Sequence, residues 1–166
     1  MPRFDPEAML RVLSAQEVQY VLIGGLAATL HGSPLRTGDA DICPAREAEN
    51  LERLAAALRL MDARVRRPDA PDGLPFACDG SSFRTVELVN LTTRFGDLDV
   101  TFVPSGTGGY HEFLDQVVEY DLGGLVVPVA GLADIIRSKE AADREKDRAA
   151  LPTLRTLLAR MTKTEG

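Results

Sequence analysis

Apolar and polar positions repeat with two different periods along this chain, and the period predicts where strands and helices lie. Segments that are apolar throughout, or that alternate apolar and polar residues, predict strands with one or both faces buried. These segments are Val18–Ile23, residues 39–42, Phe83–Leu91, Asp97–Val103 and Leu125–Val129. We expect the third and fourth of them to pair as an antiparallel hairpin that turns near Arg94–Gly96.

Apolar residues three or four positions apart predict helices in the rest of the chain. The predicted helices cover residues 6–15, Leu26–Leu30, residues 45–61, Tyr110–Tyr120 and Leu132–Ala150, with Leu151–Met161 continuing helically after Pro152. The clearest amphipathic pattern is that of residues 45–61, in which Leu51, Leu54, Leu58 and Met61 mark the buried side.

Residues 68–82 contain three prolines and two glycines, so we expect a loop there. The predicted strands and helices are interleaved, with an antiparallel pair in the middle of the chain. That order predicts an α+β fold with a mixed sheet (α/β in part). A length of 166 residues suits a single domain over residues 1–166.

Composition narrows the class of protein. Hydrophobic residues make up 45% and charged residues 27%, a balance typical of globular proteins. No stretch approaches the roughly 20 apolar residues that span a membrane, and the N-terminus lacks the apolar core of a signal peptide, so we expect a cytoplasmic protein without a membrane partner. The net charge of −6 argues against binding nucleic acid through the overall field, so any RNA contact must come from a local basic patch.

Two aspartates near the end of the second predicted strand are the first candidates for chemistry. Alternate residues of a strand face one side, so Asp39 and Asp41 would point together while Ala40 and Ile42 point into the core. Asp99, in the next alternating segment, offers a third carboxylate. Like charges on one face repel unless a cation or a proton offsets them, and this arrangement suits two-metal phosphoryl chemistry. Hydrogen-bonded, solvated turns are the alternative, above all for Asp97.

The glycine pair Gly24–Gly25 and the lysine Lys139 can each have a structural or a phosphate-binding role. Gly24 and Gly25 follow an apolar strand, where they form either a tight turn or a bare backbone that a phosphate can approach. The segment has neither the Lys-Ser/Thr of a P-loop nor the third glycine of a dinucleotide-binding loop. Lys139 lies four and eight positions before Asp143 and Asp147, so it either forms ion pairs on a solvated helix or is directed at a triphosphate.

Taken together, these motifs resemble the signature of minimal nucleotidyltransferases of the polymerase-β-like superfamily. The similarity is strongest to the AbiEii- and MenT-like toxins of bacterial toxin–antitoxin systems, and it spans about residues 18–158. The segments that carry it are Gly24–Gly25, His31–Ile42, Thr93–Val100, Leu132–Lys139 and Arg144–Asp147. The resemblance implies a polymerase-β-like nucleotidyltransferase fold with flanking helices.

The resemblance also implies roles for individual residues. Asp39 and Asp41 would hold two Mg²⁺ ions, with Mn²⁺ as an alternative, and Asp99 would ligate the catalytic metal and help deprotonate the attacking hydroxyl. The residues implied to bind the nucleotide are Gly24, Gly25, Arg36, Thr37 and Lys139.

The leading hypothesis from the sequence is a toxin that transfers an NMP from an NTP such as ATP to an RNA hydroxyl, at a tRNA 3′ end, and is restrained by an antitoxin protein. Besides the resemblance, it rests on local basic residues, which are Arg64, Arg66, Arg67 and the cluster within residues 137–148. Other acceptors stay open: a small molecule such as an antibiotic, or a protein. A non-catalytic nucleotide-binding module is the third reading. A pI near 5.0 favours a small molecule or a protein over bulk RNA.

Overall fold

A computed structural model describes residues 3–165, and within that range eight strands form one mixed sheet. The strands are β1 (Tyr20–Ile23), β2 (Asp39–Pro44), β3 (Arg64–Arg67), β4 (Ala70–Leu74), β5 (Leu88–Thr93), β6 (Gly96–Thr101), β7 (Val118–Leu122) and β8 (Leu125–Val129). Their order across the sheet is β4-β3-β5-β6-β2-β1-β8-β7. The central pairs β2–β6 and β1–β8 are parallel, and the other neighbouring strands are antiparallel.

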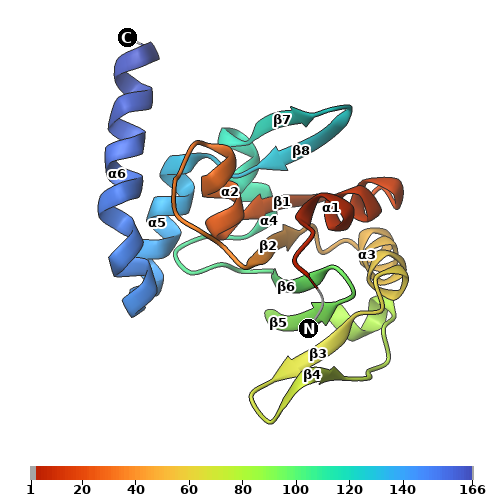
Figure 1. The fold of residues 1–166 in the computed structure, drawn as a ribbon. Coiled ribbons are helices and arrows are strands. Elements are labelled where there is room, and N and C mark those ends of the chain that lie inside the picture. Colours follow the sequence, from red (N-terminus) through yellow and green to blue (C-terminus); the bar gives the residue numbers. More distant parts are fainter. Residues whose placement is uncertain (1–2, 166) are drawn as a thin grey trace.

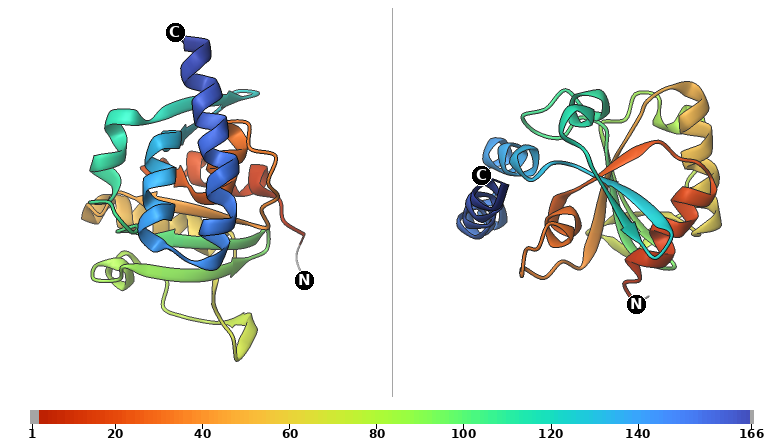
Figure 2. Two further views of the ribbon diagram at one scale, coloured as in Figure 1. Left: turned by 90° about the vertical axis from the view of Figure 1, so that its left-hand side faces the viewer. Right: turned by 90° about the horizontal axis from the view of Figure 1, so that it is seen from above.

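Helices cover both faces of this sheet, as Figures 1 and 2 show. They are α1 (Pro6–Ala15), α2 (Gly24–Leu30), α3 (Ala48–Leu60), α4 (Tyr110–Phe113), α5 (Leu132–Ala142) and α6 (Glu145–Glu165), with the short 3-10 helices η1 (Gly80–Phe83) and η2 (Leu114–Gln116). Helices α1 and α3 lie on one face, and α2, α5 and α6 lie on the other. Among the described helices, none combines the length and the apolar character needed to cross a membrane.

The hydrophobic core fills both sides of the sheet, under α1 and α3 on one face and under α2, α5 and α6 on the other. Ala40 and Ile42 are fully buried in β2, as their alternation with the two aspartates predicts. The predicted buried side of α3 is confirmed, since Leu51, Leu54, Leu58 and Met61 all lie within the core. The opposite face of β2 carries Asp39 and Asp41, so the same strand separates the core from the layer that holds the charged residues.

Two predicted helices in the second half of the chain are wrong in part. The predicted helix Tyr110–Tyr120 ends early, because α4 and η2 cover its first half and β7 its second. The turn after β7 is made by Gly123 and Gly124, both with positive φ, which lets β7 fold back on β8. Helix Leu132–Ala150 is two helices, broken at Asp143, whose φ of 50° lies in the left-handed region.

The predicted loop over residues 68–82 contains strand β4, and the predicted strand Phe83–Leu91 begins only at Leu88. Strand β4 is the outermost strand of the sheet and pairs with β3 alone. An edge strand tolerates proline, because one of its sides makes no ladder hydrogen bonds, and Pro71 lies there. Local composition therefore indicated a loop where pairing with β3 produces a strand.

Candidate active site

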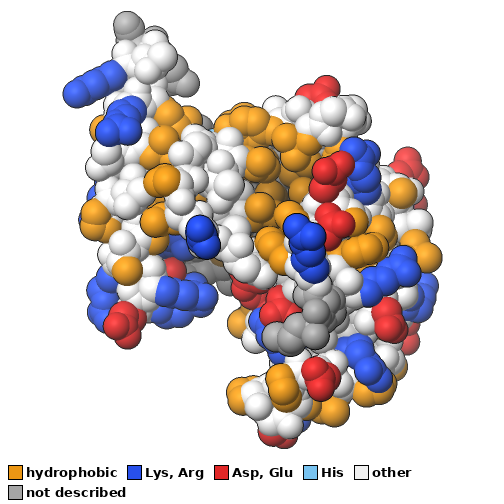
Figure 3. All heavy atoms as spheres, viewed as in Figure 1, with side chains coloured by type: hydrophobic (Ala, Val, Ile, Leu, Met, Phe, Trp, Pro, Cys, Tyr) orange, Lys and Arg blue, Asp and Glu red, His pale blue; other side chains and the backbone are white. Residues whose placement is uncertain are grey.

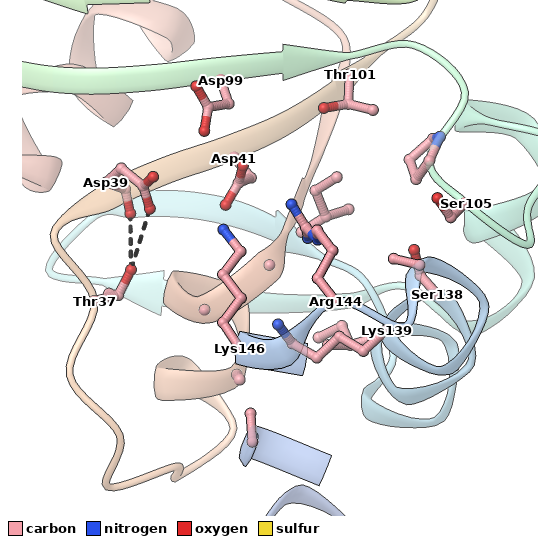
Figure 4. A pocket seen from close by; sticks show the side chains of 18 of the residues that line it. Thr37, Asp39, Asp41, Asp99, Thr101, Ser105, Ser138, Lys139, Arg144 and Lys146 are labelled. Atoms are coloured by element: carbon pink, nitrogen blue, oxygen red, sulfur yellow. Dashed lines mark hydrogen bonds between the residues drawn. The ribbon is translucent and has the colours of Figure 1, made fainter. Parts of the chain in front are cut away.

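Strands β2 and β6 bring three carboxylates together on the face that α2, α5 and α6 cover. The two strands are parallel, and Asp41 lies directly opposite Asp99 in their register. Asp39 completes the cluster, in which one carboxylate oxygen of each residue lies within 4.8 Å of the others. Figure 4 shows the three side chains pointing toward one another. The structure thus brings together the three residues that the sequence predicts as metal ligands.

The electrostatics of this triad are those of a site that favours a cation. Burial, followed by the charges of Asp39 and Asp99, raises the pKa of Asp41 from its ordinary 3.8 to about 7. Burial also raises the pKa of Asp99, although a nearby guanidinium opposes the shift. Three hard oxygen donors at this spacing are the ligands that Mg²⁺ and Mn²⁺ prefer, so the residues present fit a divalent metal.

The glycine pair is explained by what lies against it. Gly24 has a φ of 71°, and a Cβ at this position would collide with the Asp41 carboxylate. A Cβ on Gly25 would lie 3.1 Å from Thr37 Oγ1. Thr37 in turn donates a hydrogen bond of 3.0 Å to the backbone carbonyl of Asp39 and lies 3.4 Å from its Oδ1. The glycines therefore let the start of α2 approach the strand that carries two of the carboxylates.

Positively charged residues from α5, α6 and the link between them face the triad across the site, as Figure 4 shows for Lys139, Arg144 and Lys146. The Asp147 carboxylate is fully buried and holds two of them. Arg144 donates to it through Nε at 2.8 Å, and Lys139 Nζ lies 3.5 Å away. Lys146 pairs with no carboxylate among residues 3–165, and its charge lowers the pKa of Asp41, against the larger effect of burial.

A cavity of about 850 Å³ lies between the triad and these cations. Figure 3 shows it as a hollow between the lower ends of α5 and α6 and the strands β5 and β6. All of the residues that the sequence predicts for the site line this one cavity: Gly24, Gly25, Arg36, Thr37, Asp39, Asp41, Asp99 and Lys139. Its volume is in the range that small-molecule sites occupy.

Sequence reasoning did not place Arg66 in this site. Arg66 lies in β3, two strands away from β6, yet its Nη2 donates a 2.9 Å hydrogen bond to Asp99 Oδ1. The sequence marked it only as part of a basic run, because which strand β3 joins is not encoded locally. Large apolar side chains at the cavity were missed as well; Leu35, Leu88 and Val103 are 40%, 55% and 46% exposed.

Comparison with known proteins identifies the fold. No protein-family model matches the chain, and no curated protein matches it in sequence. Among solved structures, the lincomycin-bound lincosamide antibiotic adenylyltransferase LnuA aligns with a TM-score of 0.61 and 17% identity over 90% of this chain and 94% of that one. A putative nucleotidyltransferase from Thermotoga maritima aligns with a TM-score of 0.56 and 17% identity over 96% and 97%. The predicted nucleotidyltransferase fold with a mixed α+β architecture is confirmed.

Proposed function

We propose that this protein is a metal-dependent nucleotidyltransferase that moves an NMP from an NTP to an acceptor hydroxyl. The observation that carries the proposal is that negatively and positively charged residues face each other across one cavity. On one side are the carboxylates of Asp39, Asp41 and Asp99, whose oxygens lie within 4.8 Å of one another. On the other side are cations from α5 and α6. A triphosphate bridged to divalent ions needs both sides at once.

Different residues of the cavity would bind the phosphates and the metal ions. Lys146 and Arg144, with Lys139 behind them, would contact the phosphates, and Arg36 and Thr37 would contact them from the loop before β2. Asp39, Asp41 and Asp99 would hold two Mg²⁺ or Mn²⁺ ions, which lower the pKa of the acceptor hydroxyl and neutralise the leaving pyrophosphate. Gly25 would let a phosphate approach the backbone, whereas Gly24 is required by the Asp41 carboxylate.

The reaction is an in-line displacement at the α-phosphorus. The acceptor oxygen forms a bond to that phosphorus while the bond to the bridging oxygen of the β-phosphate breaks, and pyrophosphate leaves with the electron pair. The hydroxyl proton would pass toward Asp99, a carboxylate of the triad that can accept it. Most of the acceleration would come from positioning and from stabilising the developing charge.

A small hydroxylated molecule is the acceptor that the cavity fits best. Its lining includes Leu88 and Val103, which are exposed although they are large and apolar. Exposed apolar side chains at a concave site favour a ligand with an apolar surface. The structural neighbour LnuA is described as a lincosamide antibiotic adenylyltransferase, which is the same class of transfer.

Many of the basic residues that suggested an RNA acceptor form ion pairs within the protein, which weakens the case for RNA. Arg67 pairs with Asp69, Arg137 with Glu112, and the further pairs include Arg148–Asp143 and Arg144–Asp147. A residue paired with a neighbouring carboxylate contributes less to attracting a polyanion, and the chain as a whole carries −6. An RNA end remains the second candidate, because Lys146 is free of such pairing among the described residues. In that case the chain would act as a toxin and need an antitoxin.

The test is to incubate the purified protein with each α-³²P-labelled NTP, Mg²⁺ and a bacterial extract separated into small-molecule, RNA and protein fractions. We expect label in the small-molecule fraction, and none with the Asp41→Asn variant. Label in RNA, falling steeply with added salt, would favour the second candidate. Absence of transfer from every NTP to every fraction, with Mg²⁺ or Mn²⁺, would contradict the proposed activity.

A further inference from the structure

The guanidinium of Arg66 bridges two aspartates of β6, and its two ends bind differently. Nη2 contacts Asp99 Oδ1 at 2.9 Å. Nη1 lies 3.2 Å from Asp97 Oδ2 and donates a 2.9 Å hydrogen bond to the carbonyl of Leu91. One end of the guanidinium is therefore fixed by two acceptors, and the other end holds only the carboxylate that belongs to the triad.

The fold directs Arg66 to this position. Arg64 and Val65 of β3 pair with Thr92 and Leu91 of β5, and the same register continued places Arg66 beside Asn90. Asn90 pairs in turn with Asp99, so the regular alternation of β3 puts Arg66 on the face of Asp99. Asp97 and Asp99 are two residues apart in β6 and face the same side. Only Asp99 belongs to the triad, however, and the side chain of Asp97 is more exposed, at 37% against 16% for Asp99.

A carboxylate that ligates a divalent cation attracts a neighbouring guanidinium less strongly, because the cation offsets part of its negative charge. From this shared use we propose that Arg66 and the metal compete for Asp99, and that Asp97 retains Arg66 when Asp99 turns to the metal. Arg66 is then a positioning residue that tunes metal affinity, and Asp97 has a purpose that is separate from ligation. The inference rests on the proposed function only in taking the triad as a metal site.

Because Arg66 is bound at both ends of its guanidinium, Asp99 can leave it for the metal while Arg66 stays in place. Releasing Asp99 breaks the contact of Nη2 alone, and the contacts of Nη1 with Asp97 and with the Leu91 carbonyl stay intact. The guanidinium therefore keeps a charged partner and is not left unpaired beside the site. Without Asp97, release of Asp99 would leave Arg66 with one neutral acceptor, so Arg66 would hold Asp99 more strongly.

The experiment measures Mn²⁺ affinity in the absence of nucleotide, by titration calorimetry or by the electron paramagnetic resonance signal of free Mn²⁺. Removing a positive charge about 3 Å from an oxygen of a proposed ligand carboxylate strengthens cation binding, so we expect Arg66→Gln to bind Mn²⁺ about tenfold more tightly. A merely structural role for Arg66 predicts weaker binding. The matched control is Arg67→Gln, next in the chain and paired with exposed Asp69, which should change the affinity little.

A double-mutant cycle separates the role proposed for Asp97 from its charge alone. Asp97→Asn should weaken Mn²⁺ binding in the wild-type background and have little effect when Arg66→Gln is already present. An equal loss in both backgrounds, or weaker binding by Arg66→Gln, would overturn the inference and leave the proposed function standing. If wild-type protein binds no Mn²⁺ and resembles Asp41→Asn in this assay, both the inference and the metal site of the proposed function fail.

Discussion

The backbone of Gly24 packs against the carboxylate of Asp41, so that no side chain fits between the first residue of α2 and the middle of the triad. Asp41 is thereby confined on one side by α2 and on the other by Asp99, its neighbour in β6. The position of this proposed metal ligand thus depends on a residue that carries no functional group.

Gly24→Ala is expected to disturb the triad more than Gly25→Ala. The added Cβ at position 24 displaces Asp41 and also meets a φ of 71°, which an L side chain rarely adopts. At position 25 the nearest atom is the movable Thr37 hydroxyl at 3.1 Å. Mn²⁺ titration should show a loss of affinity for Gly24→Ala and a smaller change for Gly25→Ala. Equal affinities in the two variants would contradict this account of Gly24.

Asp39→Asn and Asp41→Asn are each expected to abolish nucleotidyl transfer without unfolding the protein. Each removes a proposed metal ligand, which costs several kcal/mol of transition-state stabilisation. Each also relieves repulsion within the triad, so thermal unfolding without metal should occur at the same or a higher temperature than in the wild type. The measurements are label transfer and calorimetric melting. Near-wild-type transfer by either variant would argue against the two-metal reading.

Metal binding and stability should depend on pH in opposite directions because the pKa of Asp41 is raised to about 7. Mn²⁺ affinity should rise with pH up to about 7, since the metal needs the ionised carboxylate. Without metal, the folded state holds this proton more tightly than the unfolded chain, so the free energy of unfolding should fall between about pH 4 and pH 7. Asp41→Asn should flatten both trends, which denaturant titrations at several pH values can check.

Lys146→Ala and Lys139→Ala should separate phosphate binding from structural support. Lys146 makes no ion pair within the described chain, so its loss should weaken NTP binding by about 1.5–3 kcal/mol and leave the melting temperature unchanged. Lys139 neutralises buried Asp147, so its loss should weaken NTP binding and also lower the melting temperature. Calorimetric titration with an NTP and Mg²⁺ measures the first effect. If Lys139→Ala binds the NTP with unchanged affinity, Lys139 serves only to pair with Asp147.

Expression of the wild-type chain alone tests the two acceptors in the cell. Transfer to a small molecule should leave bacterial growth intact, with Asp39→Asn as the matched inactive control. Growth arrest by the wild type and not by Asp39→Asn would favour the RNA candidate and a toxin held in check by a partner.

Much of the site could be predicted because its pattern is local. The alternation of Asp39 and Asp41 with Ala40 and Ile42 fixes which side chains share a face, whatever the neighbouring strands are. The same reasoning predicts the orientation of Asp99 in β6. Periodicity also predicts α1 and the buried side of α3, since a helix buries residues that recur every three or four positions.

Other features were decided by tertiary structure, because they depend on which strand lies beside which. Composition indicated a loop where β4 pairs with β3 at the sheet edge, and helical spacing was predicted where β7 folds back on β8. Arg66 reaches Asp99 only because β3 joins the sheet next to β5, which lies between β3 and β6. The sequence by itself determined that Asp39 and Asp41 share a face and that Asp99 alternates with buried residues, since side-chain alternation is a property of one strand. Strand order, which arises from contacts between segments distant in the chain, brought Asp99 beside Asp41 and placed the guanidinium that competes for Asp99.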